Sequence, residues 1–216
     1  MLYRLFAGMS LQVIIARVIV LMTAIPVHEF AHAYAAEKMG DSTARYNRRL
    51  SLNPFDHIDP LGALMILFLG FGFARPVPIN TLNFRDRTKG IVVTSLAGPV
   101  SNILMALVCL VIAKLLRLAY ALSGLTFIVG VFQVISFMVR INLMLAAFNL
   151  LPIPPLDGWN AICPLLPREL YWKIQPYEQQ MVWLVLILVW VGALDGILGF
   201  ITGGLYIIID VLTSFL

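Results

Sequence analysis

The sequence His28-Glu29-Phe30-Ala31-His32 determines how the rest of the chain is interpreted. Residues four apart share one face of an α-helix, so both imidazoles can reach a single metal ion while Glu29 lies beside them to transfer protons. The motif lies in an apolar stretch, residues 11–36, where Arg17 is the only other charged residue. Ionisable side chains at membrane depth are costly and indicate function. The motif therefore predicts a metal centre, in preference to two histidines hydrogen-bonded by chance inside a helix bundle.

The composition indicates a membrane protein. Of the 216 residues, 61% are hydrophobic and 12% are charged, whereas soluble domains are about 45–50% apolar and about 25% charged. The net charge of +4 does not favour a nucleic-acid partner, because the basic residues fall in loops where membrane topology explains them. We expect an all-α polytopic protein of the cell membrane, with about four to five transmembrane helices in contact with the lipid bilayer.

Four apolar stretches predict the membrane helices, since about 20 residues cross a bilayer core. They cover residues 10–39, 90–116, 127–151 and 181–216. Pro26 predicts a kink in the first stretch just before the histidines. The last stretch is too long for one span, and its glycines are expected to divide it into a span and a shorter helix. These are Gly196, Gly199, Gly203 and Gly204.

A shorter apolar run lies between the first two stretches. Residues 61–74 are too few for an ordinary span, and the prolines of Arg75-Pro76-Val77-Pro78-Ile79-Asn80 disfavour a following helix. We expect a re-entrant or β-like membrane segment near residues 61–80. It either plugs the helix bundle or offers a strand edge to an unwound substrate, whose freed backbone groups need new partners.

Two residues compete to be the third metal ligand. Catalytic zinc usually takes three protein ligands and keeps a fourth position for water or substrate. His28 and His32 provide two, and the third is either His57, in a loop, or Asp157, just after the 127–151 stretch with Gly158 giving the backbone freedom to turn. Spacing alone does not choose, because Asp157 also fits an ordinary turn and His57 also fits a loop-stabilising role.

Topology adds a constraint on Asp157. It follows the C-terminal end of one helix, and the histidines lie near the C-terminal end of another, so the ends meet only if the two helices run parallel. Residues 61–74 then cannot cross the membrane fully. Most basic residues consequently share one side, which the positive-inside rule places in the cytoplasm, and the site opens there. They are Lys38, Arg45, Arg48, Arg49, Arg75, Arg85, Arg87, Lys89, Arg168 and Lys173, with Arg4, Lys114 and Arg117 opposite.

Further motifs resemble the site-2 protease family, zinc metalloproteases that cleave substrates within the membrane. The matching pieces are Ser51-Leu52-Asn53-Pro54, His57-Ile58-Asp59-Pro60, Arg75 to Asn80, Ser95-Leu96-Ala97-Gly98-Pro99 with Ser101-Asn102, and Phe148-Asn149-Leu150-Leu151-Pro152 leading to Leu156-Asp157-Gly158. The chain is similar to the short, minimal branch without PDZ or nucleotide-sensing domains. One departure is Arg48-Arg49, where a glycine-arginine pair is expected.

This resemblance implies one integral-membrane metalloprotease domain over residues 1–216, with a catalytic core at about 10–158 and C-terminal helices at about 180–216. It implies that His28, His32 and Asp157 hold one zinc ion and that Glu29 is the catalytic base. The reaction would be hydrolysis of a peptide bond in or near a transmembrane helix of a membrane-protein substrate.

Three further polar residues are candidates for supporting the substrate or the reaction. Asn102 and Asn149 either do this or make interhelical hydrogen bonds, which membrane helices often use, and His57 is a weaker candidate. Arg140 lies in the middle of an apolar stretch, where it either faces an aqueous cleft or pairs with a carboxylate such as Asp195.

Two other functions compete with proteolysis. A metal-ion transporter would need further acidic or histidine residues on other helices, and the apolar stretches contain almost none. A catalytically inactive membrane scaffold is hard to reconcile with the presence of Glu29 together with three plausible metal ligands.

Overall fold

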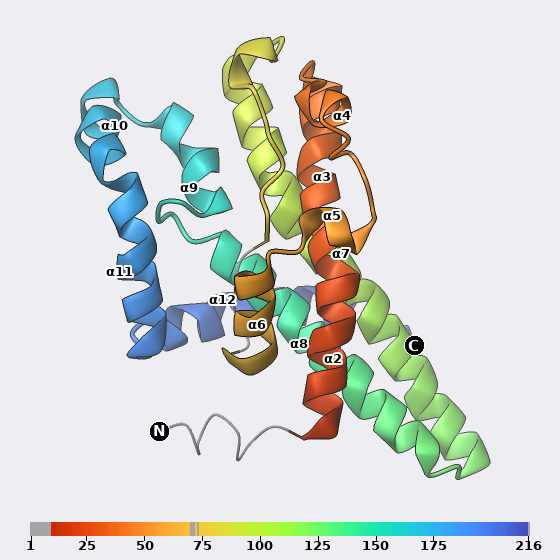
Figure 1. Ribbon diagram of the computed structural model, residues 1–216. Coiled ribbons are helices and arrows are strands. Elements are labelled where there is room, and N and C mark those ends of the chain that lie inside the picture. Colours follow the sequence, from red (N-terminus) through yellow and green to blue (C-terminus); the bar gives the residue numbers. More distant parts are fainter. Residues whose placement is uncertain (1–9, 70–71, 73, 216) are drawn as a thin grey trace.

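The computed structural model describes residues 10–69, 72 and 74–215, which form helices and loops without a β-strand (Figure 1). Four helical stretches are long and apolar enough to cross a membrane, namely Leu11–Met39, Arg87–Ser123, Phe127–Asn149 and Asp195–Leu212. The expected class, an all-α polytopic membrane protein, is therefore confirmed.

The first stretch consists of two helices, α2 (Leu11–Met22) and α3 (Ala24–Met39), joined at Thr23. Thr23 departs from helical geometry, with φ −125° and ψ −63°. Pro26 has no N–H to donate to the carbonyl of Met22, four residues earlier, so the helix breaks near that carbonyl. The predicted kink is present, and it lies three residues before the proline.

Helix α7 (Arg87–Ser123) and helix α8 (Phe127–Asn149) form an antiparallel hairpin (Figure 1). Helix α7 is longer than predicted. Its 37 residues extend for about 55 Å at 1.5 Å per residue, more than the about 30 Å of a bilayer core. In Figure 1, α3 and α8 run toward the same end of the molecule and α7 runs the opposite way. This is the parallel arrangement that Asp157 requires.

Small side chains let these helices approach one another. Ala16 and Ala24 of the first stretch and Ala106 of α7 are fully buried in a core that also includes Leu143 of α8. Membrane helices pack closely where side chains are small, because their association depends on van der Waals contact and not on the hydrophobic effect. The resulting bundle is the rigid frame that carries the histidines.

The segment between α3 and α7 leaves this frame and returns to it. It contains α4 (Thr43–Tyr46), α5 (Pro54–His57), α6 (Pro60–Leu69) and, after an extended stretch, the short 3-10 helix η1 (Thr81–Asn83). The N–H of Arg75 donates to the carbonyl of His57 at 2.8 Å. The chain that follows α6 therefore lies beside the chain that precedes α6. Residues 61–74 therefore make no one-way crossing. The expected β-like alternative is not found in the described part of this segment.

The C-terminal region contains four α-helices and two short 3-10 helices. The α-helices are α9 (Asp157–Ile162), α10 (Arg168–Ile174), α11 (Glu178–Trp190) and α12 (Asp195–Leu212), and the 3-10 helices are η2 (Cys163–Leu165) and η3 (Gln175–Tyr177). The predicted division of the last apolar stretch is confirmed, but its predicted position is wrong. The chain turns at residues 191–194, where Gly192 has a φ of +75°, and the four glycines expected to break the helix lie inside α12. Glycine is tolerated within membrane helices, so only the glycine with a left-handed backbone marks the break.

Candidate active site

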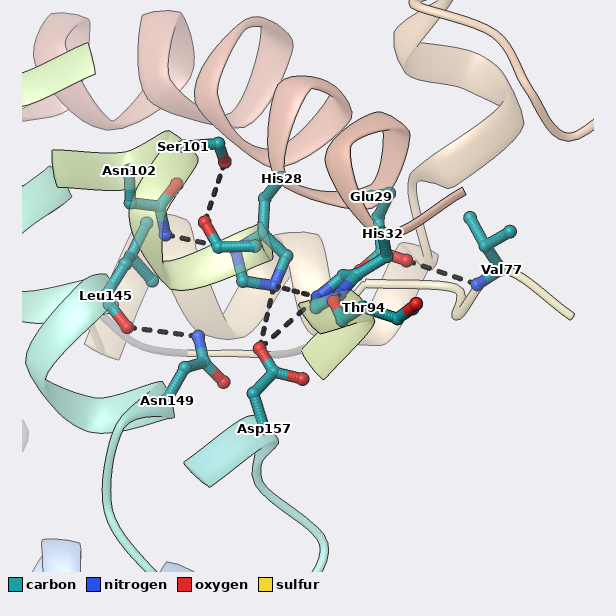
Figure 2. Close-up of polar contacts among 11 residues, drawn as sticks. His28, Glu29, His32, Val77, Thr94, Ser101, Asn102, Leu145, Asn149 and Asp157 are labelled. Carbon is teal, nitrogen blue, oxygen red and sulfur yellow. Dashed lines mark hydrogen bonds and ion pairs between the residues drawn. The ribbon is translucent and has the colours of Figure 1, made fainter. Parts of the chain in front are cut away.

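Two helices bring three potential metal ligands together. His28 and His32 come from α3, and Asp157 is the first residue of α9 (Figure 2). The two Nε2 atoms lie 3.0 Å apart, and each lies 3.3 Å from Oδ2 of Asp157. Ligands at about 2.0–2.1 Å from a tetrahedral zinc ion are themselves about 3.3–3.4 Å apart. Two edges of the triangle match this spacing and the edge between the two Nε2 atoms is about 0.3 Å shorter, so the triangle is close to the size that one zinc ion requires.

Each imidazole is oriented through its other ring nitrogen. Nδ1 of His32 lies 2.8 Å from the carbonyl of Thr94 on α7 and donates to it, which leaves Nε2 free for a metal. Nδ1 of His28 lies 3.2 Å from the amide nitrogen of Asn102. The buried Oδ1 of Asn102 has no hydrogen-bond partner among the described residues. Turning this amide by 180° lets Oδ1 accept the Nδ1–H of a metal-bound His28.

The carboxylate of Asp157 is suited to a cation. Its Oδ2 is buried, faces the two imidazoles and has no other partner in the described part of the chain. Burial raises the pKa of Asp157. Hydrogen bonds and charge interactions with His28 and His32 outweigh burial and lower the pKa to well below its usual range. The group is ionised at neutral pH. Two imidazoles and a buried carboxylate are the donors that zinc prefers, so these residues fit a zinc ion.

Two glycines allow the ligands to meet. A Cβ atom at Gly98 on α7 would lie 2.2 Å from Nε2 of His32 and 2.6 Å from Cε1 of His28. A Cβ atom at Gly158 would lie 2.3 Å from the carbonyl oxygen of Leu150. The expected role of Gly158 was freedom to turn, but its φ is not positive. Its role is close approach to the end of α8.

Glu29 lies beside the triangle without belonging to it. Glu29 is 8% exposed, and its Oε2 accepts a hydrogen bond of 3.1 Å from the N–H of Val77. Glu29, His28, His32 and Asp157 all line one cavity of about 740 Å³. A carboxylate in this position can exchange protons with a water molecule near the metal without binding the metal.

The cavity lies between the helical frame and the C-terminal helices. Its walls are mostly apolar and include Met65 of α6, Phe148 of α8, Val185 of α11 and Leu198 of α12. Its described lining contains no lysine or arginine. Such a cavity fits an apolar peptide segment and exposes it to a polar centre.

The three other polar residues predicted to support the reaction differ in their position relative to the cavity. Asn102 contacts His28, as described above. Asn149 lines the cavity, and its amide nitrogen donates to the carbonyl of Leu145 in its own helix at 3.0 Å. His57 is fully buried outside the cavity lining, with Nε2 at 2.8 Å from the carbonyl of Ser51. His57 therefore stabilises its loop in this structure.

Arg140 does not pair with the suggested carboxylate. It is exposed on α8, and no ion pair joins it to Asp195 within the described residues. Asp195 instead lines the cavity at the start of α12.

The sequence does not indicate the contacts that Thr94 and Val77 make with His32 and Glu29. Both act through backbone atoms, which no side-chain pattern reports. Gly98 lay in a recognised motif, and its role as a close-approach residue depends on the fold.

Comparisons with known proteins identify the family of the chain. The family model described as Peptidase family M50 matches residues 16–192. YwhC of Bacillus subtilis (strain 168), named as a candidate zinc metalloprotease, is 42% identical over 179 residues, which cover 82% of this chain and 81% of YwhC. Rip2 of Mycolicibacterium smegmatis, named in the same way, is 34% identical over 178 residues, or 78% of this chain and 64% of Rip2.

A more distant relative is MJ0611 of Methanocaldococcus jannaschii, also named as a candidate zinc metalloprotease. It is 29% identical over 167 residues, which cover 72% of this chain and 75% of MJ0611. No solved structure matches the chain significantly.

Proposed function

The chain belongs to peptidase family M50, the site-2 protease family, and is an intramembrane zinc metalloprotease; from this we propose that His28, His32 and Asp157 hold the zinc ion and that Glu29 is the catalytic base. The observation that supports the assignment is the ligand triangle, with edges of 3.0, 3.3 and 3.3 Å. Membership of a peptidase family does not favour the transporter or the inactive scaffold.

The proposed reaction is hydrolysis of a peptide bond in or near a transmembrane helix of a membrane-protein substrate. When bound, zinc supplies Lewis-acid chemistry that acidifies water and polarises the scissile carbonyl. Glu29 accepts a proton from the attacking water and then donates it to the leaving amine, so it is regenerated as a carboxylate. The apolar walls of the cavity hold the apolar chain on either side of the cleaved bond.

An unwound substrate needs hydrogen-bond partners in this cavity. Pro76, Val77 and Ile79 line it, while α6 packs against the first stretch through Ile66, Leu21 and Ile25. We assign the packing role to α6 and the substrate-pairing role to the extended chain near Ile79. Different parts of residues 61–80 then carry the two functions considered for this segment, which are packing against the helix bundle and pairing with the substrate.

The proposed orientation places the site toward the cytoplasm. Helix α4, the start of α7 and helix α10 lie at one end of the molecule, and the turn between α7 and α8 lies at the other (Figure 1). Most of the basic residues named above belong to or flank the first three elements. The positive-inside rule supports a cytoplasmic location for that end. We also propose that the whole chain acts as one metalloprotease domain.

Zinc analysis of the wild-type protein and of four alanine variants tests the ligand assignment. Purified protein should contain about one zinc ion per chain. His28→Ala, His32→Ala and Asp157→Ala should lose most of it, whereas His57→Ala should retain it. Zinc loss in His57→Ala with retention in Asp157→Ala would show the ligand assignment to be wrong.

Glu29→Gln separates catalysis from metal binding. Glutamine preserves size and hydrogen bonding but cannot act as a base at neutral pH. The variant should keep its zinc and lose hydrolysis of a model transmembrane peptide by about 10²–10⁴-fold. Full zinc occupancy with near-normal cleavage would exclude the proposed mechanism.

A further inference from the structure

An extended segment lies against the catalytic glutamate. We call residues 75–80 the strap. Its Val77 is 8% exposed and packs in a cluster with Ala33 of α3. The N–H of Val77 donates to Oε2 of Glu29 at 3.1 Å, and Figure 2 shows the two residues facing each other. The sequence separation is 48 residues, so the contact exists only because the strap returns to α3.

The sequence of the strap limits which backbone group can reach Glu29. Pro76 and Pro78 flank Val77, and proline has no N–H. Val77 therefore carries the only backbone donor among these three residues. In the structure, that donor is directed at the proposed catalytic base.

The strap is fixed on both sides of Val77. Before it, Nη2 of Arg49 donates to the carbonyls of Arg75 and Pro76, at 2.7 and 3.2 Å. After it, Oδ2 of Asp41 accepts the N–H of Asn80 at 2.7 Å. These anchors hold the donor in place before any substrate binds.

Asp41 is a strong anchor because its carboxylate accepts several hydrogen bonds that hold it in place. It is fully buried at the end of α3. Burial raises its pKa, but hydrogen bonds from Thr43, Asn83 and Asn80 outweigh burial and lower the pKa below its usual value. Asp41 therefore stays ionised and keeps the strap attached to the helix that carries Glu29.

A general base must present one oxygen to water while the rest of its side chain stays in place. A carboxylate can accept several hydrogen bonds, so a donor on Oε2 leaves Oε1 available for the proton. A buried carboxylate also needs such a partner, because it is costly to bury without one. We propose that the backbone N–H of Val77 is a positioning group for the catalytic base, holding Oε2 of Glu29 so that Oε1 exchanges the proton.

This inference rests on the proposed role of Glu29, and two variants of one residue test it. Val77→Pro removes the N–H, whereas Val77→Ala keeps the N–H and removes most of the side chain. Both are measured in the full-length protein with a model transmembrane peptide. Val77→Pro should lower kcat by about 10- to 10²-fold, as expected for a misplaced catalytic group, with KM within two-fold and zinc content unchanged. Because Val77→Ala keeps the N–H, its kcat should fall much less than that of Val77→Pro.

A second variant covers the case in which Val77→Pro does not fold. Replacing Val77 by its α-hydroxy acid converts the N–H to an ester oxygen and leaves the side chain intact. The same replacement at Thr81, the first residue of η1 and outside the cavity lining, is the control. The ester at position 77 should lower kcat with zinc retained, and the ester at position 81 should leave kcat near normal.

Equal kcat values for the two esters would overturn the inference about Val77. If Glu29→Gln is inactive at the same time, the proposed function still stands. An active Glu29→Gln would overturn both.

Discussion

Gly98 is the residue that lets α7 approach the two imidazoles. A Cβ atom there would lie 2.2 Å from Nε2 of His32, so the ring would have to shift by roughly an ångström to restore normal contact. Zinc ligands must stay within about 0.2 Å of their ideal distances. We therefore expect Gly98→Ala to weaken zinc binding by at least about 10–100-fold, the range seen when groups supporting a metal ligand are lost.

The control for this substitution is Gly130→Ala. Gly130 lies on α8, and a Cβ atom there would meet nothing within 4 Å. Competition with a chelator measures both affinities. Wild-type affinity in Gly98→Ala would mean that the histidines do not pack against α7 as described.

At the scale of elements, α6 depends on a residue of another helix. Nη1 of Arg17 on α2 donates to the carbonyls of Leu67 and Phe68, at 2.7 and 3.2 Å. These carbonyls belong to the last turn of α6, and a cation can bind the carbonyl groups at such a helix end. In an apolar environment, a cation there also interacts favourably with the negative end of the helix. Arg17, the only charged residue besides Glu29 in residues 11–36, therefore caps a short helix.

Removing this cap should destabilise α6. We expect Arg17→Leu to cost about 1.5–3 kcal/mol, the worth of hydrogen bonds from a charged group, and to make the segment around residues 60–74 more sensitive to proteolysis in detergent. Arg117→Leu, at an exposed arginine of α7, is the control and should have little effect. Equal protease sensitivity in both variants would show that Arg17 does not hold α6.

The kink and the break in the apolar stretches were predictable to different degrees. Pro26 acts on its own helix by removing one N–H, so a kink near it follows from local chemistry. The break at residues 191–194 follows from a left-handed Gly192. Five glycines in the region could have taken that conformation, and packing selected one. The length of the last apolar stretch therefore predicted that the helix breaks, but it did not predict where the break lies.

At the scale of the whole molecule, the topology can be tested directly. The N–H of Arg85 donates to the carbonyl of Met39 at 3.0 Å, which joins the end of α3 to the approach to α7. The loops on either side of α6 must then lie on the same side of the membrane. Single cysteines at positions 45 and 85, in a variant lacking Cys109 and Cys163, should react with an impermeant label from the same side. Opposite accessibility would contradict the topology and the role of Asp157.

The sequence by itself determined the helical class, the apolar stretches, the paired histidines and the adjacent glutamate. These features depend on helix periodicity and on hydrophobic length, which act within one segment. The site-2 protease resemblance also rested on motifs that can be read locally. Each of these predictions concerns what a segment does in its own surroundings.

The resemblance predicted Asp157 as the third ligand, and the tertiary structure places Asp157, and not His57, against the histidines. Only the tertiary structure revealed the roles of Thr94, Val77 and Gly98. These contacts join residues 48 and 62 positions apart, for Val77 with Glu29 and Thr94 with His32. Two of them use backbone groups, and the third requires the absence of a side chain. Residue type carries no record of such contacts, because they arise only when packed helices bring distant backbones together.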